Sequence, residues 1–291
     1  MQIRSLGLAT DVGLAATRGT LVDRGDCLVV ETPDDPGYYY GNLLVLPEPP
    51  RADSIDRWQA RFHHELPNPE IRHVTLAWDG IAGDAGPVDE LEAAGFTMDH
   101  SVVMSAAAVI AHPVMLPIRC LEPHELTVDL AWAVADRHDE SYRRFLQRRV
   151  AWHRDLIARG IARWYGAFDG AHLVASLGLV DLVASSGPWS GPLAHHARYQ
   201  DVETAVAYRK RGLASALLAA AANDAFSREI ATVVIVAEPG GDAARVYTRV
   251  GFTAIEHVVS ACLRPVTEPA RHTSRPWRAM TESRLWPIAS G

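Results

Sequence analysis

Three consecutive cations precede a glycine in the C-terminal half of the chain: Arg209, Lys210, Arg211 and Gly212. Residues 202–206 before them alternate with a strand-like period of two, and residues 213–222 after them repeat leucine and alanine at helical spacing. The sequence therefore predicts a strand that enters a helix through a basic turn. Such a turn presents uncapped backbone N–H groups and the positive end of a helix dipole, and Gly212 lets the backbone approach an anion closely. The predicted chemistry is the binding of a phosphate.

The elements around this turn are predicted from periodicity and turn residues. A first strand is expected near residues 116–120, followed by helices over 122–136 and 140–159. Two strands at 162–168 and 172–181 flank the dipeptide Asp169-Gly170, which is a strong hairpin signal. The basic turn thus follows a run of strands that can pair into one sheet.

The spacing around the turn identifies the kind of phosphate site. Neither the P-loop pattern GxxxxGK[ST] nor the dinucleotide pattern GxGxxG occurs here. Instead, Arg209, Gly212 and Ala214 follow a strand at the spacing R-x-x-G-x-A, which resembles the pyrophosphate-binding signature R/Q-x-x-G-x-G/A of the GNAT acyltransferases. A second GNAT-like signature follows: a Val/Ile strand at 232–237, a short helix with Tyr247, and Gly251-Phe252. The resemblance covers residues 116–263.

This resemblance implies an α/β (α+β) fold with a mixed, mostly antiparallel central sheet flanked by helices, and acetyl-CoA (coenzyme A) as the cofactor. By resemblance, backbone groups near Val202 and Thr204 hold the pantetheine arm and the acetyl carbonyl, and the turn amides hold the pyrophosphate. The full set of expected cofactor-binding residues is Val202, Thr204, Arg209, Lys210, Arg211, Gly212, Leu213 and Ala214.

The same resemblance makes Tyr247 the acid that protonates the departing thiolate. An aromatic residue before Gly-Phe can also simply fill the space between helix and sheet, so both roles stay open. One departure from the family is Gly240-Gly241-Asp242, which stands where many members have an asparagine. Another is Val206, where proline is frequent.

Acetyl transfer to an amine also needs a general base. An alkyl amine of pKa ~10.4 is neutral in only about one molecule in ~2,500 at pH 7, so a group that removes its proton accelerates the reaction. Glu238 at the end of the second signature strand and His196 at the start of the first are candidates. Glu203 is a third candidate, although its phase places it on the face opposite Val202 and Thr204. Each of these side chains is alternatively a solvated surface residue.

Composition restricts the class of protein. The chain has 291 residues, a length that suits two domains, and a formal net charge of −7, which argues against a general nucleic-acid binder. Its three separated cysteines indicate reduced thiols in a cytoplasmic protein, and no apolar run approaches the length of a membrane span. The neighbouring histidine pairs at 63–64 and 195–196 lack a third ligand at helical spacing, so no metal site is expected.

The chain also contains an internal similarity. Residues 95–103 and 251–259 are 156 positions apart and identical at five of nine positions. The sequence therefore predicts a tandem arrangement with a degenerate GNAT-like domain at 1–110, a catalytic domain at 116–263 and an extended tail at 264–291. The first copy has prolines and Glu48 where the second has its basic turn, and Leu91 where the second has Tyr247. We therefore expect a non-catalytic copy that lacks a pyrophosphate site, covers a face of the C-terminal sheet and walls the acceptor pocket of the second copy.

Three functions are compatible with these residues. The first is an acetyl-CoA-dependent N-acetyltransferase that moves an acetyl group directly to a primary amine of a small molecule. The second is a protein or peptide N-acetyltransferase, and the third is a non-catalytic acyl-CoA-binding sensor. No nucleic-acid or membrane partner is expected. A monomer is favoured over a homodimer, because a duplicated chain can make within itself the contacts that single-copy relatives make by dimerising.

Overall fold

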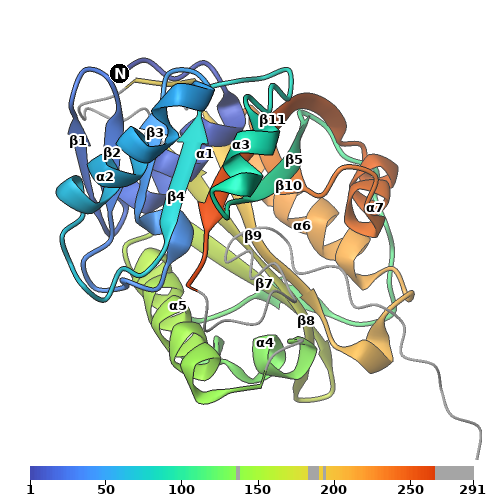
Figure 1. Ribbon diagram of the computed structural model, residues 1–291. Helices are drawn as coiled ribbons and strands as arrows, with labels where there is room; N and C mark the ends of the chain where they lie inside the picture. Colours follow the sequence, from blue (N-terminus) through green and yellow to red (C-terminus); the bar gives the residue numbers. More distant parts are fainter. Residues whose placement is uncertain (136–137, 183–189, 193–194, 266–291) are drawn as a thin grey trace, which may run out of the picture.

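A computed structural model describes residues 1–135, 138–182, 190–192 and 195–265. Nearly all of the predicted extended tail lies outside these residues. The described strands form one sheet (Figure 1), and their bounds are β1 Thr20–Asp23, β2 Leu28–Glu31, β3 Leu43–Leu46, β4 Val74–Trp78, β5 Thr97–Ala106, β6 Ile118–Cys120, β7 Ala162–Asp169, β8 His172–Leu182, β9 His196–Thr204, β10 Thr232–Ala237 and β11 Thr253–Leu263. The described α-helices are α1 Leu6–Ala16, α2 Ile55–Glu65, α3 Val88–Ala93, α4 Asp129–Val134, α5 Glu140–Ala158, α6 Leu213–Ser227 and α7 Asp242–Val250.

The sheet is mixed and mostly antiparallel, as predicted. Its strand order is β1-β2-β3-β4-β11-β5-β10-β9-β8-β7-β6. Among the described strands only two neighbouring pairs are parallel, β3 with β4 and β9 with β10. The hairpin predicted at Asp169-Gly170 is confirmed, because β7 and β8 pair antiparallel around Gly170, whose φ is +59°.

Helices cover both faces of the sheet. On one face α6 and α7 pack over the strands of the C-terminal half, and α2 and α3 pack over those of the N-terminal half. On the other face α1 and α5 share a core cluster that includes Val30, Trp164 and Leu182. The helix predicted over 122–136 is shorter than expected. Pro123–Glu125 form a 3-10 turn closed by a capping box between Glu122 and Glu125, and α4 begins only at Asp129.

The two halves of the chain exchange strands in the centre of the sheet. β5, from the N-terminal half, lies between β10 and β11, and β11, from the C-terminal half, lies between β4 and β5. In the β5–β11 ladder Ser101 pairs with Val258 and Val102 with His257. Shifting each residue by the 156 positions of the sequence similarity converts one of these pairs into the other, so the ladder has an approximate twofold relation. The predicted domain bounds of 1–110 and 116–263 stay a prediction, since strands from both sides share one sheet.

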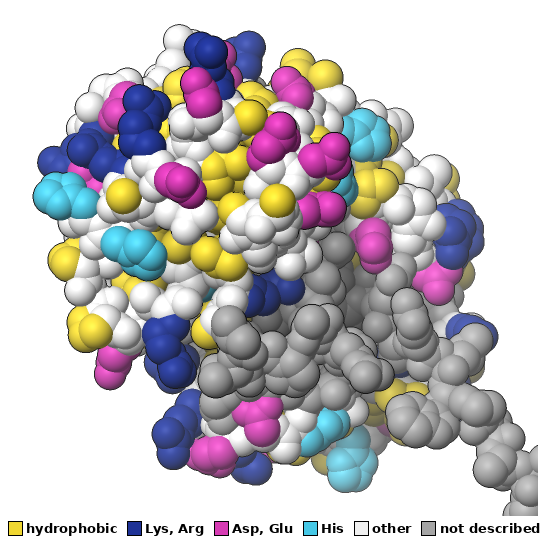
Figure 2. Space-filling view, in the orientation of Figure 1, with side chains coloured by type: hydrophobic (Ala, Val, Ile, Leu, Met, Phe, Trp, Pro, Cys, Tyr) yellow, Lys and Arg dark blue, Asp and Glu magenta, His cyan; other side chains and the backbone are white. Residues whose placement is uncertain are grey.

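Charges of both signs are mixed on the face shown in Figure 2, with Lys and Arg gathered mainly at the left and Asp and Glu nearer the upper centre. Among the described helices none is both long and apolar enough to span a bilayer. The described cysteines, Cys27, Cys120 and Cys262, are free thiols.

The first helix is anchored to the last strand by one buried carboxylate. Glu256 accepts hydrogen bonds from Ser5 Oγ at 2.7 Å, Leu6 N at 2.8 Å and Gly7 N at 3.1 Å. It lies beside a bulge in β11 that directs it toward α1. These donors are buried and belong to the uncapped first turn of a helix, where an anion is favoured. The contact therefore joins the two ends of the described chain.

We expect Glu256→Gln to lower the free energy of unfolding by about 2 kcal/mol, because an amide cannot accept all three bonds and places an N–H group against helix donors. Urea denaturation followed by circular dichroism measures this loss. Glu92→Gln on the exposed side of α3 is the matched control and should leave the midpoint unchanged. Equal midpoints for both variants would contradict the anchoring role of Glu256.

Candidate active site

The parallel strands β9 and β10 separate partway along their length. Their ladder joins His196 to Thr232 and extends only to Arg198 and Val234. Beyond that point β9 continues along β8 as far as Thr204, and β10 continues along β5 as far as Ala237. The carboxyl-terminal parts of the two strands therefore diverge into a V, and their facing backbone edges do not pair with each other. Such edges can form hydrogen bonds to an extended ligand.

A bulge in β9 changes which residues face each side of the sheet. The register between β8 and β9 shifts between Ser176 and Gly178, and Asp201 adopts a left-handed φ of +49°. Tyr199 and Val202 consequently lie in the same core cluster beneath α6. Glu203 lies on the opposite face, as the alternation of the sequence predicts.

The predicted phosphate turn lies at the open end of the V. A 3-10 turn, Val206–Tyr208, follows β9, and Lys210 and Gly212 both adopt left-handed φ values of +61° and +79°. Gly212 is the N-cap of α6, and no side chain caps the helix. Lys210 and Arg211 are exposed beside this uncapped end. The arrangement fits an anionic phosphate, since N–H groups, helix dipole and cations converge there.

Arg209 has a different place in the turn. Its Nε donates to Thr204 O at 3.2 Å, so its side chain ties the turn to the end of β9. Tyr208 Oη donates to Asp169 Oδ2 at 2.6 Å, and the Arg211 guanidinium lies 5.0 Å from the centre of the Tyr208 ring. These contacts fix the turn against the β7–β8 hairpin.

Tyr247 lies on α7, as predicted, and only 1% of its surface is exposed. It belongs to the core cluster that includes Leu213 and Leu217 of α6, and its ring lies 6.2 Å from that of Phe252. This packing positions the ring between helix and sheet. Its role as an acid remains a prediction.

The three candidate bases lie in different environments. Glu203 is 5% exposed, and burial raises the pKa of its carboxyl to about 7 while the positive charge of Arg149 opposes that shift. Glu238 directly follows β10 and is exposed. His196 pairs with Thr232 at the closed end of the V. Glu203 and Glu238 both lie beyond the point where the strands diverge, and of the two Glu203 is the buried one.

A buried charged cluster next to Glu203 was not predicted from the sequence. Arg149 and His153 lie one turn apart on α5, and both contact Asp201: Arg149 forms an ion pair with it, and His153 Nδ1 lies 3.5 Å from its Oδ2. His153 stacks on Trp164 with ring centres 4.2 Å apart. Burial, with the neighbouring Arg149 and Arg18, lowers the pKa of His153 well below its usual value, so the ring is neutral at pH 7. The available signal was Arg149 and His153 at i and i+4 on a helix.

Residues of the N-terminal half close this side of β9. Asp35 is fully buried and accepts bonds from Arg18 at 3.1 Å and from Arg148 of α5 at 2.7 Å. The Arg18 guanidinium also lies over the rings of Tyr38 and Trp152. Burial raises the pKa of Tyr38, and the positive charges of Arg18 and Arg149 partly oppose this increase. Side chains of both halves of the chain therefore pack together beside the face of β9 that carries Glu203.

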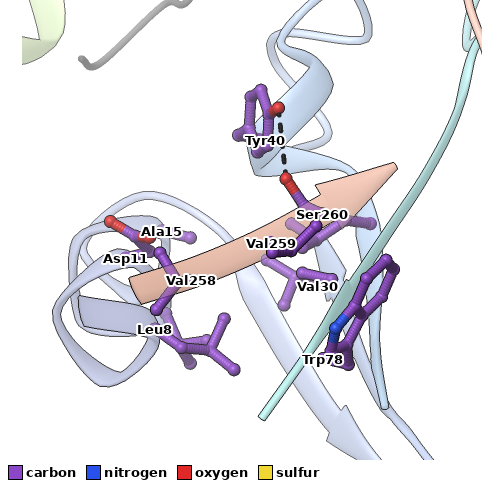
Figure 3. A pocket seen from close by; sticks show the side chains of 12 residues that line it. Leu8, Asp11, Ala15, Val30, Tyr40, Trp78, Val258, Val259 and Ser260 are labelled. Atoms are coloured by element: carbon purple, nitrogen blue, oxygen red, sulfur yellow. Dashed lines mark hydrogen bonds between the residues drawn. The ribbon is translucent and has the colours of Figure 1, made fainter. Parts of the chain in front are cut away.

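A separate small cavity lies between α1, strands of the N-terminal half and β11 (Figure 3). Its volume is about 30 Å³, enough for about two water molecules. Leu8 and Asp11 of α1 line it together with Trp78, and Tyr40 Oη lies 3.4 Å from Ser260 Oγ at its edge. None of the predicted site residues lines it.

Comparisons with known proteins agree with this geometry. Residues 128–252 match the family model of the acetyltransferase (GNAT) family. A functionally unknown conserved protein from Staphylococcus epidermidis ATCC 12228 superposes with a TM-score of 0.63 at 10% identity, covering 85% of this chain and 95% of that chain. A GCN5-related N-acetyltransferase from Kribbella flavida superposes with a TM-score of 0.61 at 14% identity, covering 89% and 95%. No curated protein matches the sequence.

The two solved structures share the fold of this chain. The match to the GNAT family model is confined to residues 128–252. That segment contains the β7–β8 hairpin, the bulge of β9, the uncapped turn before α6 and Tyr247. Residues 128–252 of this chain therefore resemble the acetyltransferase (GNAT) family in sequence, and the chain shares its fold with a GCN5-related N-acetyltransferase.

Proposed function

We propose that the chain is an acetyl-CoA-dependent N-acetyltransferase that transfers an acetyl group directly to a primary amine of a small molecule. The observation that carries the proposal is the V between β9 and β10, which has the uncapped, basic turn at Gly212 at its open end. Glu203 lies on the other face of β9 at the bulge. Acetyl-CoA bound in the V and an amine bound on the opposite face of the sheet would thus meet at β9.

The expected donor contacts follow from this arrangement. The backbone edge of β9 at Val202 and Thr204 would hold the pantetheine arm, and the amides of Gly212, Leu213 and Ala214 would hold the pyrophosphate. Lys210 and Arg211 add positive charge, while Arg209 supports the turn through Thr204. When bound, acetyl-CoA supplies a thioester carbonyl that an amine can attack.

Direct transfer requires side chains of this protein to accept one proton and to donate another. The amine nitrogen bonds to the acyl carbon as the carbon–sulfur bond breaks, so the amine loses one proton and the sulfur gains one. Glu203 accepts the first, because a carboxyl with a pKa near 7 is substantially ionised at neutral pH and still basic enough to take a proton. Tyr247 donates the second.

A small acceptor is supported by burial on this side of β9. Glu203 is nearly inaccessible, and Arg18, Asp35 and Tyr38 pack against α5 beside it. A protein tail would need an open groove at the same place. We therefore favour a small amine as the acceptor. We further propose that the protein is a cytoplasmic monomer and that its N-terminal half is a non-catalytic copy.

Gly212→Glu should abolish the binding of acetyl-CoA, because it places an anion and a side chain in the phosphate turn. Isothermal titration measures the dissociation constant directly. Gly160→Glu is the matched control, since Gly160 also has a positive φ of +71° but ends α5 away from the V. Undiminished binding by the Gly212 variant would place the cofactor elsewhere.

Glu203→Gln should lower kcat/KM by about 10²–10⁴-fold while leaving acetyl-CoA affinity unchanged, because the amide cannot accept a proton. In the wild type the slope of log kcat/KM against pH should decrease near pH 7, because Glu203 is half ionised there and mostly ionised at higher pH. The variant should lose that break and keep the slope that comes from the amine itself. The rate is followed by release of the CoA thiol with the best acceptor of a primary-amine panel.

Two controls accompany this measurement. Glu238→Gln, at the exposed end of β10, should leave the profile intact. Stability gives the second control. The folded-state pKa of Glu203 is raised, so its ionisation costs stability as the pH rises from about 4.5 to about 7. The Gln variant should therefore be at least as stable as the wild type at pH 8, and a retained break near pH 7 would exclude Glu203 as the base.

Tyr247→Phe should lower kcat by about 10²-fold and leave the dissociation constant of acetyl-CoA unchanged, because only the hydroxyl proton is removed and the ring still fills the core. Stopped-flow or steady-state thiol release gives the rate, and calorimetry gives the affinity. An unchanged kcat would show that Tyr247 only packs between α7 and the sheet.

A further inference from the structure

The segment that connects β5 to β6, residues 107–117, follows a path past the donor site. It leaves β5 along the end of α7, where Ile110 N donates to Val250 O at 2.8 Å and His112 Nε2 lies 3.3 Å from Arg249 O. It then passes the phosphate turn, where Val114 Cγ1 lies 3.8 Å from the position of a Cβ on Gly212. This connecting segment is therefore in van der Waals reach of the turn expected to hold the pyrophosphate.

The connecting segment leaves a large apolar side chain in solvent next to that contact. Met115 is 98% exposed, whereas its neighbour Val114 is partly buried against the core cluster under α6. Consecutive Cα atoms are about 3.8 Å apart. Met115 therefore lies next to Val114, the residue that approaches Gly212. Val206, in the 3-10 turn before Lys210, is 63% exposed. Met115 and Val206 are thus apolar side chains that a ligand extending from the charged turn can contact.

The chemistry around this point matches the nucleotide end of the donor. Phosphates held by the amides at Gly212 and by Lys210 and Arg211 would leave the attached purine outside the V. A purine has two apolar faces and would lose contact with water against a side chain such as methionine, which is unbranched and adapts its shape to a planar ring. The V itself already accommodates the pantetheine arm in the proposed function, on which this step rests.

We propose that Val114 and Met115 of the connecting segment form the contact surface for the adenine ring of acyl-CoA. The link between the two halves of the chain is then part of the donor site. Val114 packs against the core cluster under α6 beside Gly212, and Met115 would cover one face of the ring. The N-terminal half thereby contributes to donor recognition through the segment that joins it to the C-terminal half.

The test compares a donor that has the nucleotide with one that lacks it. Titration calorimetry measures the dissociation constants of acetyl-CoA and of acetyl-pantetheine for the wild type, Met115→Ser and Met115→Leu. Met115→Ser should weaken acetyl-CoA about five- to tenfold, because a partly buried apolar contact is lost, and should leave acetyl-pantetheine unchanged. Met115→Leu should restore most of the affinity.

Ile81→Ser is the matched control, because Ile81 is also an exposed large hydrophobic residue, at 53%, but belongs to the N-terminal half. Unchanged acetyl-CoA affinity in Met115→Ser, or an equal loss for both donors, would overturn the adenine contact and leave the proposed function standing. A wild type that binds neither donor would overturn the proposed function and this inference together.

Discussion

The antiparallel ladder between β5 and β11 is the contact on which the rest of the structure depends. Each of these strands comes from one half of the chain and lies between strands of the other half. β10 has β5 as its second neighbour and β4 has β11, so neither half can complete its sheet alone. An interior strand without a neighbour would leave buried N–H and C=O groups unpaired, at a cost comparable to a lost hydrogen bond for each group. The two halves are therefore expected to fold as one cooperative unit.

This arrangement also determines the electrostatics beside Glu203. Joining the sheets places α1 and residues 31–42 next to α5, so that charged side chains of both halves become buried together. Burial of Glu203 outweighs the attraction of Arg149, and the resulting pKa near 7 corresponds to roughly 3 kcal/mol in favour of the neutral carboxyl. Arg149 is itself engaged by Asp201, which limits the charge it can offer to Glu203. A fully compensated ion pair would keep the carboxylate ionised but make it a weaker base.

The sequence was most informative where structure is local. The turn at Gly212, the hairpin at Asp169-Gly170 and the placement of Glu203 on the face opposite Val202 follow from residue types and short spacings, and the structure has each of them. The bulge at Asp201 and the strand exchange depend on pairing between distant residues, which periodicity does not encode. The cluster of Arg149, His153 and Asp201 was missed for the same reason, since its members come from a helix and a strand about 50 residues apart.

A comparison of the two halves explains why one of them is suited to bind a donor. In the N-terminal half the parallel ladder between β3 and β4 continues to Leu46 and Trp78, the last residues of both strands. No divergence comparable to that beyond Val234 opens between them. The chain after β3 then continues with Pro47, Pro49 and Pro50, which have no N–H groups to offer an anion. Strand divergence and turn donors are thus present together in the C-terminal half and missing together from the described part of the N-terminal half. A site for acyl-CoA requires both features. A V without N–H groups at its open end cannot hold the phosphates, and a turn with N–H groups beside a closed ladder leaves no space for the pantetheine arm.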